Sequence, residues 1–314
     1  MEKHESYLWV ERYKPHSVEE CILPQRIKDS LNEYVESGQI KNYIAVGPAG
    51  CGKTSSAMAL LEQMNVQYLF INASSEGSID TIRNKVTRFA TTKSILSDYK
   101  VVVLDECDYL SMNAQAALRG IMEQFYQNCR FILTANFGNR VLEPLKSRAP
   151  VVDFSFSKAE KKEMMQKFLP RIAGILDENE VTYDKKELVK FCVTTFPDFR
   201  RTLNLLQRAS VNGVLDFSLA SSVTDETITQ LSKHIIDLDF DSMSKWVAEN
   251  VDNDGHVVRR ALYDKLFPRL KDDSIPSLIM ILNDFDRYEV QVKDLEIHMK
   301  AMCITIMQEC EFLD

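Results

Sequence analysis

A glycine-rich segment carries the clearest chemistry in this sequence. Gly47-Pro48-Ala49-Gly50-Cys51-Gly52-Lys53-Thr54 matches the phosphate-loop pattern G-x-x-x-x-G-K-[ST] at every fixed position. An apolar run precedes it and a helix-forming run starts at Ser55, so we expect a strand, a turn and a helix N-terminus in that order. Backbone N–H groups and the helix dipole then favour an anion, Lys53 supplies an ammonium group, and Thr54 supplies a hydroxyl ligand for Mg²⁺. The sequence therefore predicts a nucleoside triphosphate site.

Two carboxylates follow a second apolar run, Val101–Leu104. Ligands bind at the carboxyl edge of parallel sheets, so we expect Asp105 to hold Mg²⁺ and its water shell. Glu106 is placed to polarise a water molecule that attacks the γ-phosphate. Asn136 ends the next strand, where an amide can reach that water or the γ-phosphate. The phosphate loop and Asp105-Glu106 are far enough apart in sequence for an extra strand and helix between them. This spacing favours a RecA-like ATPase over a small-molecule kinase.

Strands and helices alternate in the first half of the chain, and they must position these residues. The expected strands are 42–47, 67–71, 100–104, 130–134 and 151–154. The expected helices are 24–37, 55–64, 79–91 and 113–126. Such alternation predicts a mostly parallel sheet wrapped by helices, which is an α/β fold.

The strand signal disappears from about residue 157, and only helices are expected beyond it. They cover 158–178, 185–195, 199–211, 225–237, 240–250, 255–267, 274–288 and 292–312. Residues 211–213 and 218–223 have the composition of linkers. We therefore expect three domains: an α/β nucleotide-binding domain at 1–155, a helical lid at 156–222 and a helical C-terminal domain at 223–314.

Composition limits the class of protein. The chain has 314 residues, of which 45% are apolar and 27% charged, as in soluble globular proteins of two or three domains. No apolar run is long enough to span a bilayer, and the polar start is unlike a secretory signal. Seven cysteines without metal-ligand spacing predict reduced thiols in a cytoplasmic protein without membrane contact. Cys51 is either an oxidation-sensitive thiol or a small packing residue. The net charge of −8 argues against a protein that is basic overall, but permits a local basic surface.

Several segments of the first 210 residues resemble, in the same order, the motifs of the AAA+ clamp-loader family of the replication factor C type. Trp9–Pro15 resembles the N-terminal box W-x-E-K/R-Y-R/K-P, and Asp105–Asp108 resembles the DEAD-like Walker B box with Cys in its third place. Asn136 matches the position called sensor 1. Leu142–Arg148 resembles the segment that carries an arginine finger, although Ala149 replaces the usual Cys.

The lid motif G-D-M-R-R-A-L-N is matched by Pro197–Asn204, with Pro in place of Gly. Arg200 there takes the position called sensor 2. The C-terminal third carries no motif and is similar to the family's oligomerising collar only in helical content and length. The short chain and these departures favour the branch of the family formed by the large ATPase subunits of T4-like bacteriophage loaders.

The resemblance implies roles for residues at matching positions. The catalytic residues would be Lys53, Asp105, Glu106, Asn136 and Arg148, with Arg148 completing the site of a neighbouring subunit. Thr54 and Asp105 would bind Mg²⁺. The ATP-binding residues would be Val10, Arg12, Tyr13, Gly47, Pro48, Ala49, Gly50, Cys51, Gly52, Lys53, Thr54, Ser55 and Arg200.

A basic helix offers a site for nucleic acid. Ser78 is expected to cap the helix that begins at Ile79, and Arg83 follows where it can meet a phosphate. In the family this segment tracks the DNA backbone, and Lys85 and Arg88 add charge, with Lys93 beyond them. A solvated helix is the alternative interpretation. Phe89 and residues 92–96 correspond to the family's clamp-facing edge, or they are ordinary core.

The resemblance implies an ATPase subunit of a sliding-clamp loader. ATP binding would hold the clamp open, and primer–template DNA, contacted through phosphates without sequence specificity, would trigger hydrolysis and clamp release. The partners would be the clamp, the DNA, other copies of this chain and a non-catalytic loader subunit. One alternative is an AAA+ ATPase of the branch-migration helicase or initiator type, which a winged-helix domain after the lid would favour. The other is an assembly module that binds ATP without hydrolysing it, which loss of Lys53, Glu106 or Arg148 would favour.

Overall fold

The computed structural model describes residues 7–75, 79–92, 94, 97–217, 225–251, 255–289, 292 and 294–313. These group into two compact units, Met1–Asp216 and Phe217–Asp314. The first unit contains both the expected α/β domain and the expected lid. The division into three domains at residues 155 and 222 therefore stays a prediction.

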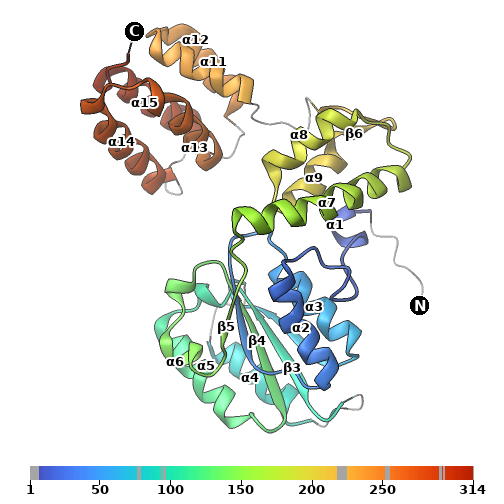
Figure 1. The fold of residues 1–314 in the computed structure, drawn as a ribbon. Coiled ribbons are helices and arrows are strands. Elements are labelled where there is room, and N and C mark those ends of the chain that lie inside the picture. Colours follow the sequence, from blue (N-terminus) through green and yellow to red (C-terminus); the bar gives the residue numbers. More distant parts are fainter. Residues whose placement is uncertain are drawn as a thin grey trace. The chain divides into compact units, whose positions relative to one another are not determined.

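A five-stranded parallel sheet forms the centre of the first unit (Figure 1). Its strands are β1 (Tyr43–Val46), β2 (Tyr68–Asn72), β3 (Lys100–Asp105), β4 (Cys129–Ala135) and β5 (Val151–Asp153). They lie in the order β2-β3-β4-β1-β5, so β1 pairs with β4, and β4 pairs with β3. This order brings the segments that follow β1, β3 and β4 together at one edge. The predicted strands and the parallel sheet are confirmed.

Helices cover both faces of the sheet because its strands are apolar on both sides (Figure 1). The helices are α2 (Gln25–Ser37) and α3 (Lys53–Gln63) on one face, and α4 (Ile79–Ala90) and α5 (Met112–Gln124) on the other. Along β3, Val101 and Val103 pack in the core beneath α2 and α3, while Val102 and Leu104 pack in the core beneath α4 and α5. Successive residues of a strand point to opposite faces, so a continuous apolar run fills both cores.

The remainder of the first unit is mainly helical and includes the segments expected to form a lid. Its helices are α1 (Trp9–Arg12), α6 (Glu143–Lys146), α7 (Lys158–Glu178), α8 (Lys185–Thr195) and α9 (Phe199–Ala209). A two-stranded hairpin, β6 (Ser210–Val211) and β7 (Val214–Leu215), follows them. Asn212 and Gly213 form its turn with φ values of 52° and 77°, the left-handed geometry for which an Asn-Gly pair is suited. The prediction that residues 211–213 are a linker was wrong, as was the absence of strands after residue 157.

A network of polar contacts fixes the start of α7. Ser157 caps the helix by accepting from the Glu160 N–H, and the Glu160 carboxylate accepts from the Ser157 N–H in return. Arg26 of α2 donates to that carboxylate at 2.7 Å, and to the backbone oxygens of Asp153 and Ser155. One arginine therefore connects the core helix α2, the end of β5 and the first turn of α7.

The second unit is built from helices packed around their own core, as predicted. They are α11 (Asp225–Ile236), α12 (Phe240–Asn250), α13 (Gly255–Leu266), α14 (Ile275–Tyr288) and α15 (Leu295–Glu309). Fully buried Leu231, Leu262, Leu278 and Ile306 belong to the core that these helices share. Among the described residues of the whole chain, no helix is long and apolar enough to cross a membrane.

Candidate functional site

The phosphate loop joins β1 to α3, as the sequence predicts. Gly50 and Gly52 have φ values of 71° and 93°, a left-handed conformation that other residues adopt only with strain. A side chain at Gly50 would also overlap the carboxylate of Asp198, which caps α9. Phe199 donates its backbone N–H to the carbonyl of Gly50 at 3.1 Å, so the lid helix α9 contacts the loop directly.

Lys53 is the first residue of α3, and its ammonium group lies inside the loop. Nζ donates to the carbonyl oxygens of Gly47 and Pro48, each at 2.7 Å, and to Oδ1 of Asn136 at 2.9 Å. The side chain is buried, and burial lowers the pKa of the ammonium group from its usual value. The structure therefore brings together two predicted catalytic residues, the loop lysine and the amide at the end of β4.

Asp105 connects the loop to the two neighbouring strand ends. Its Oδ1 accepts from the hydroxyl of Thr54 and from the hydroxyl of Thr134, each at 2.6 Å. The Thr134 hydroxyl in turn accepts from the backbone N–H of Glu106 at 3.0 Å. Glu106 has a φ of 57°, an uncommon value for a residue with a side chain, and it lines the same cavity as Asp105. The Thr134 contact holds the backbone at that point.

The Thr54 hydroxyl and the Asp105 carboxylate suit Mg²⁺. Both are hard oxygen donors, and they already lie within hydrogen-bond distance of each other. The described residues contain no cluster of three or more histidine, cysteine or acidic side chains that could hold a metal alone. At phosphate sites Mg²⁺ is held by one or two protein oxygens together with phosphates and water.

A cavity of about 460 Å³ collects the predicted ATP-binding residues. The predicted residues that line it are Val10, Tyr13, Ala49, Gly50, Gly52, Lys53, Thr54, Ser55, Asp105, Glu106, Asn136 and Arg200. Tyr13 accepts at its hydroxyl from Asn179 of the α7 C-cap, at 2.7 Å, and its ring lies beneath the guanidinium of Arg171. Segments from α1, the loop, three strand ends and the lid therefore enclose one pocket.

Four predicted ATP-binding residues do not line this cavity in the described part of the chain. Gly47, Pro48 and Cys51 lie behind it; the first two offer carbonyls to Lys53, and Cys51 is fully buried. Burial raises the pKa of the Cys51 thiol, which supports its role as a packing residue rather than a reactive thiol. The Arg12 guanidinium donates to Asn179, so its predicted nucleotide contact stays a prediction without geometric support.

Sequence reasoning missed several residues of the cavity. Asn72 ends β2 opposite Asp105, and this polar strand end was a signal that could have identified it. Thr134 carries the contact between Asp105 and Glu106, yet Thr is common in strands and gives no signal by itself. The missed lid and apolar lining residues are Ile22, Leu23, Phe168, Arg171, Ile172, Ile175 and Leu203. Nothing in their spacing indicates a pocket, because only the packing of α7, α9 and the segment before α2 brings them there.

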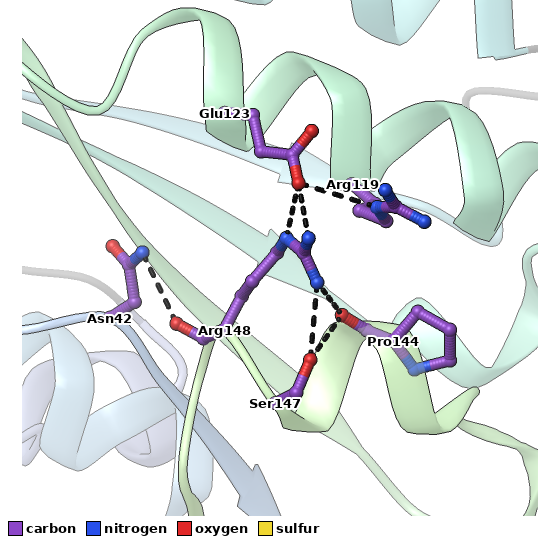
Figure 2. Close-up of polar contacts among 6 residues, drawn as sticks. All are labelled: Asn42, Arg119, Glu123, Pro144, Ser147 and Arg148. Carbon is purple, nitrogen blue, oxygen red and sulfur yellow. Dashed lines mark hydrogen bonds and ion pairs between the residues drawn. The ribbon is translucent and has the colours of Figure 1, made fainter.

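Arg148 lies apart from this cavity, between α6 and β5. Its guanidinium donates through Nε and Nη2 to Oε1 of Glu123 on α5, the Nε contact being 2.7 Å (Figure 2). Nη1 donates to the carbonyl of Pro144 and the hydroxyl of Ser147 (Figure 2). The described residues that line the cavity do not include Arg148, so its predicted role stays a prediction.

The predicted DNA-binding residues are partly described. Arg83, Lys85 and Arg88 are exposed on α4, and Arg83 lies 3.4 Å from Asp80 one turn earlier. Ser78, Lys93 and the predicted edge residues Ile95 and Leu96 lie outside the described residues. Phe89 packs against the sheet core, and the buried Lys100 ammonium lies 4.6 Å from its ring centre. These residues stay predictions for DNA and clamp contacts.

The α/β core and the second unit each match the sequence pattern of a known protein family. Residues 43–156 match the ATPase family associated with various cellular activities, and residues 256–311 match the C-terminal domain of the sliding-clamp-loader large subunit. The sliding-clamp-loader large subunit of Escherichia phage RB69 is 31% identical over 308 residues, which cover 95% of each chain. The chain belongs to the family of sliding-clamp-loader large subunits.

Further relatives widen this result. The sliding-clamp-loader large subunit of Enterobacteria phage T4 is 29% identical over 96% of each chain. The replication factor C small subunit of Saccharolobus solfataricus is 36% identical over 67% of this chain and 64% of that protein. The resemblance to clamp loaders is confirmed, as is the predicted α/β core with helical domains. As a member of this family, the chain described in this structure is an ATP hydrolase and binds nucleotide.

Solved structures agree on the fold. The Holliday junction branch migration motor RuvB of Thermotoga maritima superposes with a TM-score of 0.54 over 72% of this chain and 80% of that one. Its sequence is only 17% identical, so the likeness concerns the fold alone. The assignment to the clamp-loader family therefore depends on the sequence relatives and on the C-terminal domain.

Proposed function

We propose that this subunit uses ATP to open a sliding clamp and to place it on primer–template DNA, with each ATP site shared between two copies of the chain. One observation carries the proposal. Lys53, Asn136, Thr54 and Asp105 are linked by hydrogen bonds around one cavity, whereas Arg148, the predicted finger, has no place in its lining. The site within one chain is therefore equipped for binding but lacks the external arginine.

Lys53 is the residue that exchanges partners on binding. Its ammonium group now donates to carbonyls of the loop, and a γ-phosphate is a stronger acceptor for a charged donor. Asn136 accepts from the same ammonium group, so it would hold Lys53 in place and present its own N–H to the γ-phosphate or the attacking water. Thr54 and Asp105 would hold Mg²⁺, which neutralises charge on the phosphate oxygens when bound.

Glu106 would orient the attacking water. Its backbone is fixed through Thr134, which also donates to Asp105. A single hydroxyl thus sets the relative positions of the metal-binding carboxylate and the water-polarising carboxylate. The lid would report that ATP is present, because Arg200 lines the cavity and α9 contacts Gly50.

Arg148 would complete the site of a neighbouring copy. Charge that accumulates on the γ-phosphate oxygens during transfer is stabilised by an arginine supplied from outside, which raises turnover by roughly 10³- to 10⁵-fold. Hydrolysis would then require the correct arrangement of neighbouring subunits, and a clamp and DNA can impose it. Arg83, Lys85 and Arg88 are the proposed phosphate contacts for the DNA backbone, together with Ser78.

The partners follow from this mechanism. They are a sliding clamp, primer–template DNA, further copies of this chain and a non-catalytic loader subunit. The bacteriophage relatives are named sliding-clamp-loader subunits, which supports a sliding clamp as the partner that is loaded. Their bacteriophage source supports the host cytoplasm as the location of the protein.

The test is the steady-state ATPase rate of the assembled loader, including its non-catalytic subunit. We expect a low rate alone and a large rise when clamp and primed DNA are added together. Unprimed duplex of the same length, without clamp, is the control for charge alone. A loader whose rate is the same with and without both partners would contradict the proposal.

A further inference from the structure

All three nitrogens of the Arg148 guanidinium donate to groups of its own subunit. Nε and Nη2 share Oε1 of Glu123, and Nη1 is shared between Pro144 and Ser147 (Figure 2). Arginine recognises a phosphate with the same forked donors that it offers to a carboxylate. The fork that a finger needs for a γ-phosphate is therefore occupied by Glu123.

The backbone of Arg148 is fixed independently of this side chain. Its N–H donates to the carbonyl of Leu145 at 3.0 Å, and its carbonyl accepts from the Asn42 amide at 3.5 Å. Asn42 also accepts from the Phe131 N–H of β4, and the adjoining Ala149 is fully buried. The guanidinium can therefore leave Glu123 by side-chain rotation while the main chain keeps its place.

Glu123 is suited to a reversible contact. It lies in the last turn of α5, its side chain is 47% exposed, and that of Arg148 is 31% exposed. Exposed ion pairs bias an equilibrium only a few-fold, so a phosphate that offers more charge can displace the carboxylate. The Arg148 hydrogen bond, with a further contribution from Arg119, holds the pKa of Glu123 below its usual range, so the carboxylate stays ionised at neutral pH.

We propose that Glu123 is a positioning residue that holds Arg148 in an unengaged subunit and competes for it with the γ-phosphate bound by a neighbouring copy. The inference rests on the proposed function of Arg148 as a finger acting between subunits. Glu123 touches neither ATP nor Mg²⁺, and it acts through Arg148 alone. Its role is to keep turnover low until subunit alignment places a phosphate within reach of the guanidinium.

The test compares wild type and Glu123→Gln in the assembled loader without clamp or DNA. Glutamine keeps the shape but removes the charge, so we expect the basal kcat to rise about two- to fivefold, the bias that an exposed ion pair provides. The KM for ATP should not change, because Glu123 lies outside the nucleotide cavity. The rate with clamp and primed DNA should change little, so the degree of stimulation falls.

Two variants separate this mechanism from a general effect. Glu33→Gln removes a more exposed carboxylate that pairs with Lys41, and it should behave as wild type. Arg148→Ala removes the guanidinium on which Glu123 is proposed to act, so adding Glu123→Gln to it should leave its basal kcat unchanged. A rise that persists in the Arg148→Ala background would assign the effect to Arg119, whose Nε lies 3.4 Å from the same oxygen, and would overturn the proposal.

The outcomes also distinguish this inference from the function on which it rests. If Arg148→Ala abolishes stimulated turnover but Glu123→Gln leaves the basal kcat unchanged or lowers it, the finger stands and the competing role of Glu123 is wrong. If Arg148→Ala is fully active, both ideas fail. Gel filtration of each variant with the non-catalytic subunit confirms that assembly is retained in every comparison.

Discussion

The side-chain oxygen of Asn136 accepts a hydrogen bond of 2.9 Å from Nζ of Lys53, although 83 residues separate the two along the chain. The parallel pairing of β1 with β4 produces this contact, because the phosphate loop follows one strand and Asn136 follows the other. A lysine held by an amide and two loop carbonyls is positioned for a phosphate before it arrives.

The first prediction concerns Lys53. Replacing it with alanine removes the only ammonium group that the described residues place within the loop, and a charge-assisted hydrogen bond contributes about 1.5–3 kcal/mol. ATP affinity should fall roughly tenfold to a hundredfold, as measured with a fluorescent ATP analogue. Lys41→Ala, which removes an exposed lysine, is the matched control and should bind normally.

Glu106 should affect hydrolysis but not binding. Glu106→Gln keeps the size of the side chain and removes its ability to accept a proton, so turnover should fall by about 10²–10⁴-fold. The dissociation constant for ATP should stay within about twofold of wild type, since Lys53 and the loop are intact. Comparable losses in affinity and turnover would instead show that Glu106 shapes the pocket.

Thr134 offers a test that the sequence did not suggest. Thr134→Val preserves its shape but removes the hydroxyl that joins Asp105 to the Glu106 backbone. We expect kcat to fall about tenfold or more, with little change in ATP affinity. Thr134→Ser restores the hydroxyl and should recover most of the rate. If Thr134→Ser loses as much activity as Thr134→Val, the hydroxyl does not explain the loss and the hydrogen-bond account fails.

The contact between Arg26 and Glu160 predicts a dependence on pH. The Ser157 backbone N–H and then Arg26 lower the pKa of Glu160 to about 2, from 4.5 for an unperturbed glutamate. Because the folded-state pKa is depressed, the stabilisation is complete above the unfolded value and is lost as the pH falls toward 2. Wild type should therefore resist denaturant better than Glu160→Gln at neutral pH, and the difference should shrink below pH 4.5.

The control for this experiment is Glu163→Gln, which removes an exposed carboxylate one turn along the same helix. It should change the denaturation midpoint little at any pH. A difference between wild type and Glu160→Gln that is constant across the pH range would show that the contribution of Glu160 is not electrostatic.

The sequence predicted the parts of this site that depend on strand ends. A phosphate loop, an Asp at the end of β3 and an Asn after β4 must meet when parallel strands pair, so Asp105 was expected beside the loop, where it accepts from Thr54. The hairpin at Asn212-Gly213 was missed because its strands are only two residues long, although the dipeptide itself was a turn signal.

Other features depend on packing that no local pattern encodes. Ile172 and Ile175 line the ATP cavity only because α7 lies over it, and their spacing fits any buried helix face. The contact between Arg148 and Glu123 joins residues from different elements, and each is a surface residue by type. Motif reasoning found Arg148 but could not show which group it contacts in its own subunit.

The most direct test of a shared ATP site is to mix two inactive subunits. Lys53→Ala copies bind nucleotide weakly but carry Arg148, whereas Arg148→Ala copies bind nucleotide normally but lack the finger. Loaders assembled from either variant alone, with the non-catalytic subunit, clamp and primed DNA, should hydrolyse ATP slowly. Loaders assembled from a mixture should recover a substantial fraction of wild-type turnover, because some sites pair an intact loop with an intact Arg148. A mixture no more active than its better parent would contradict the account.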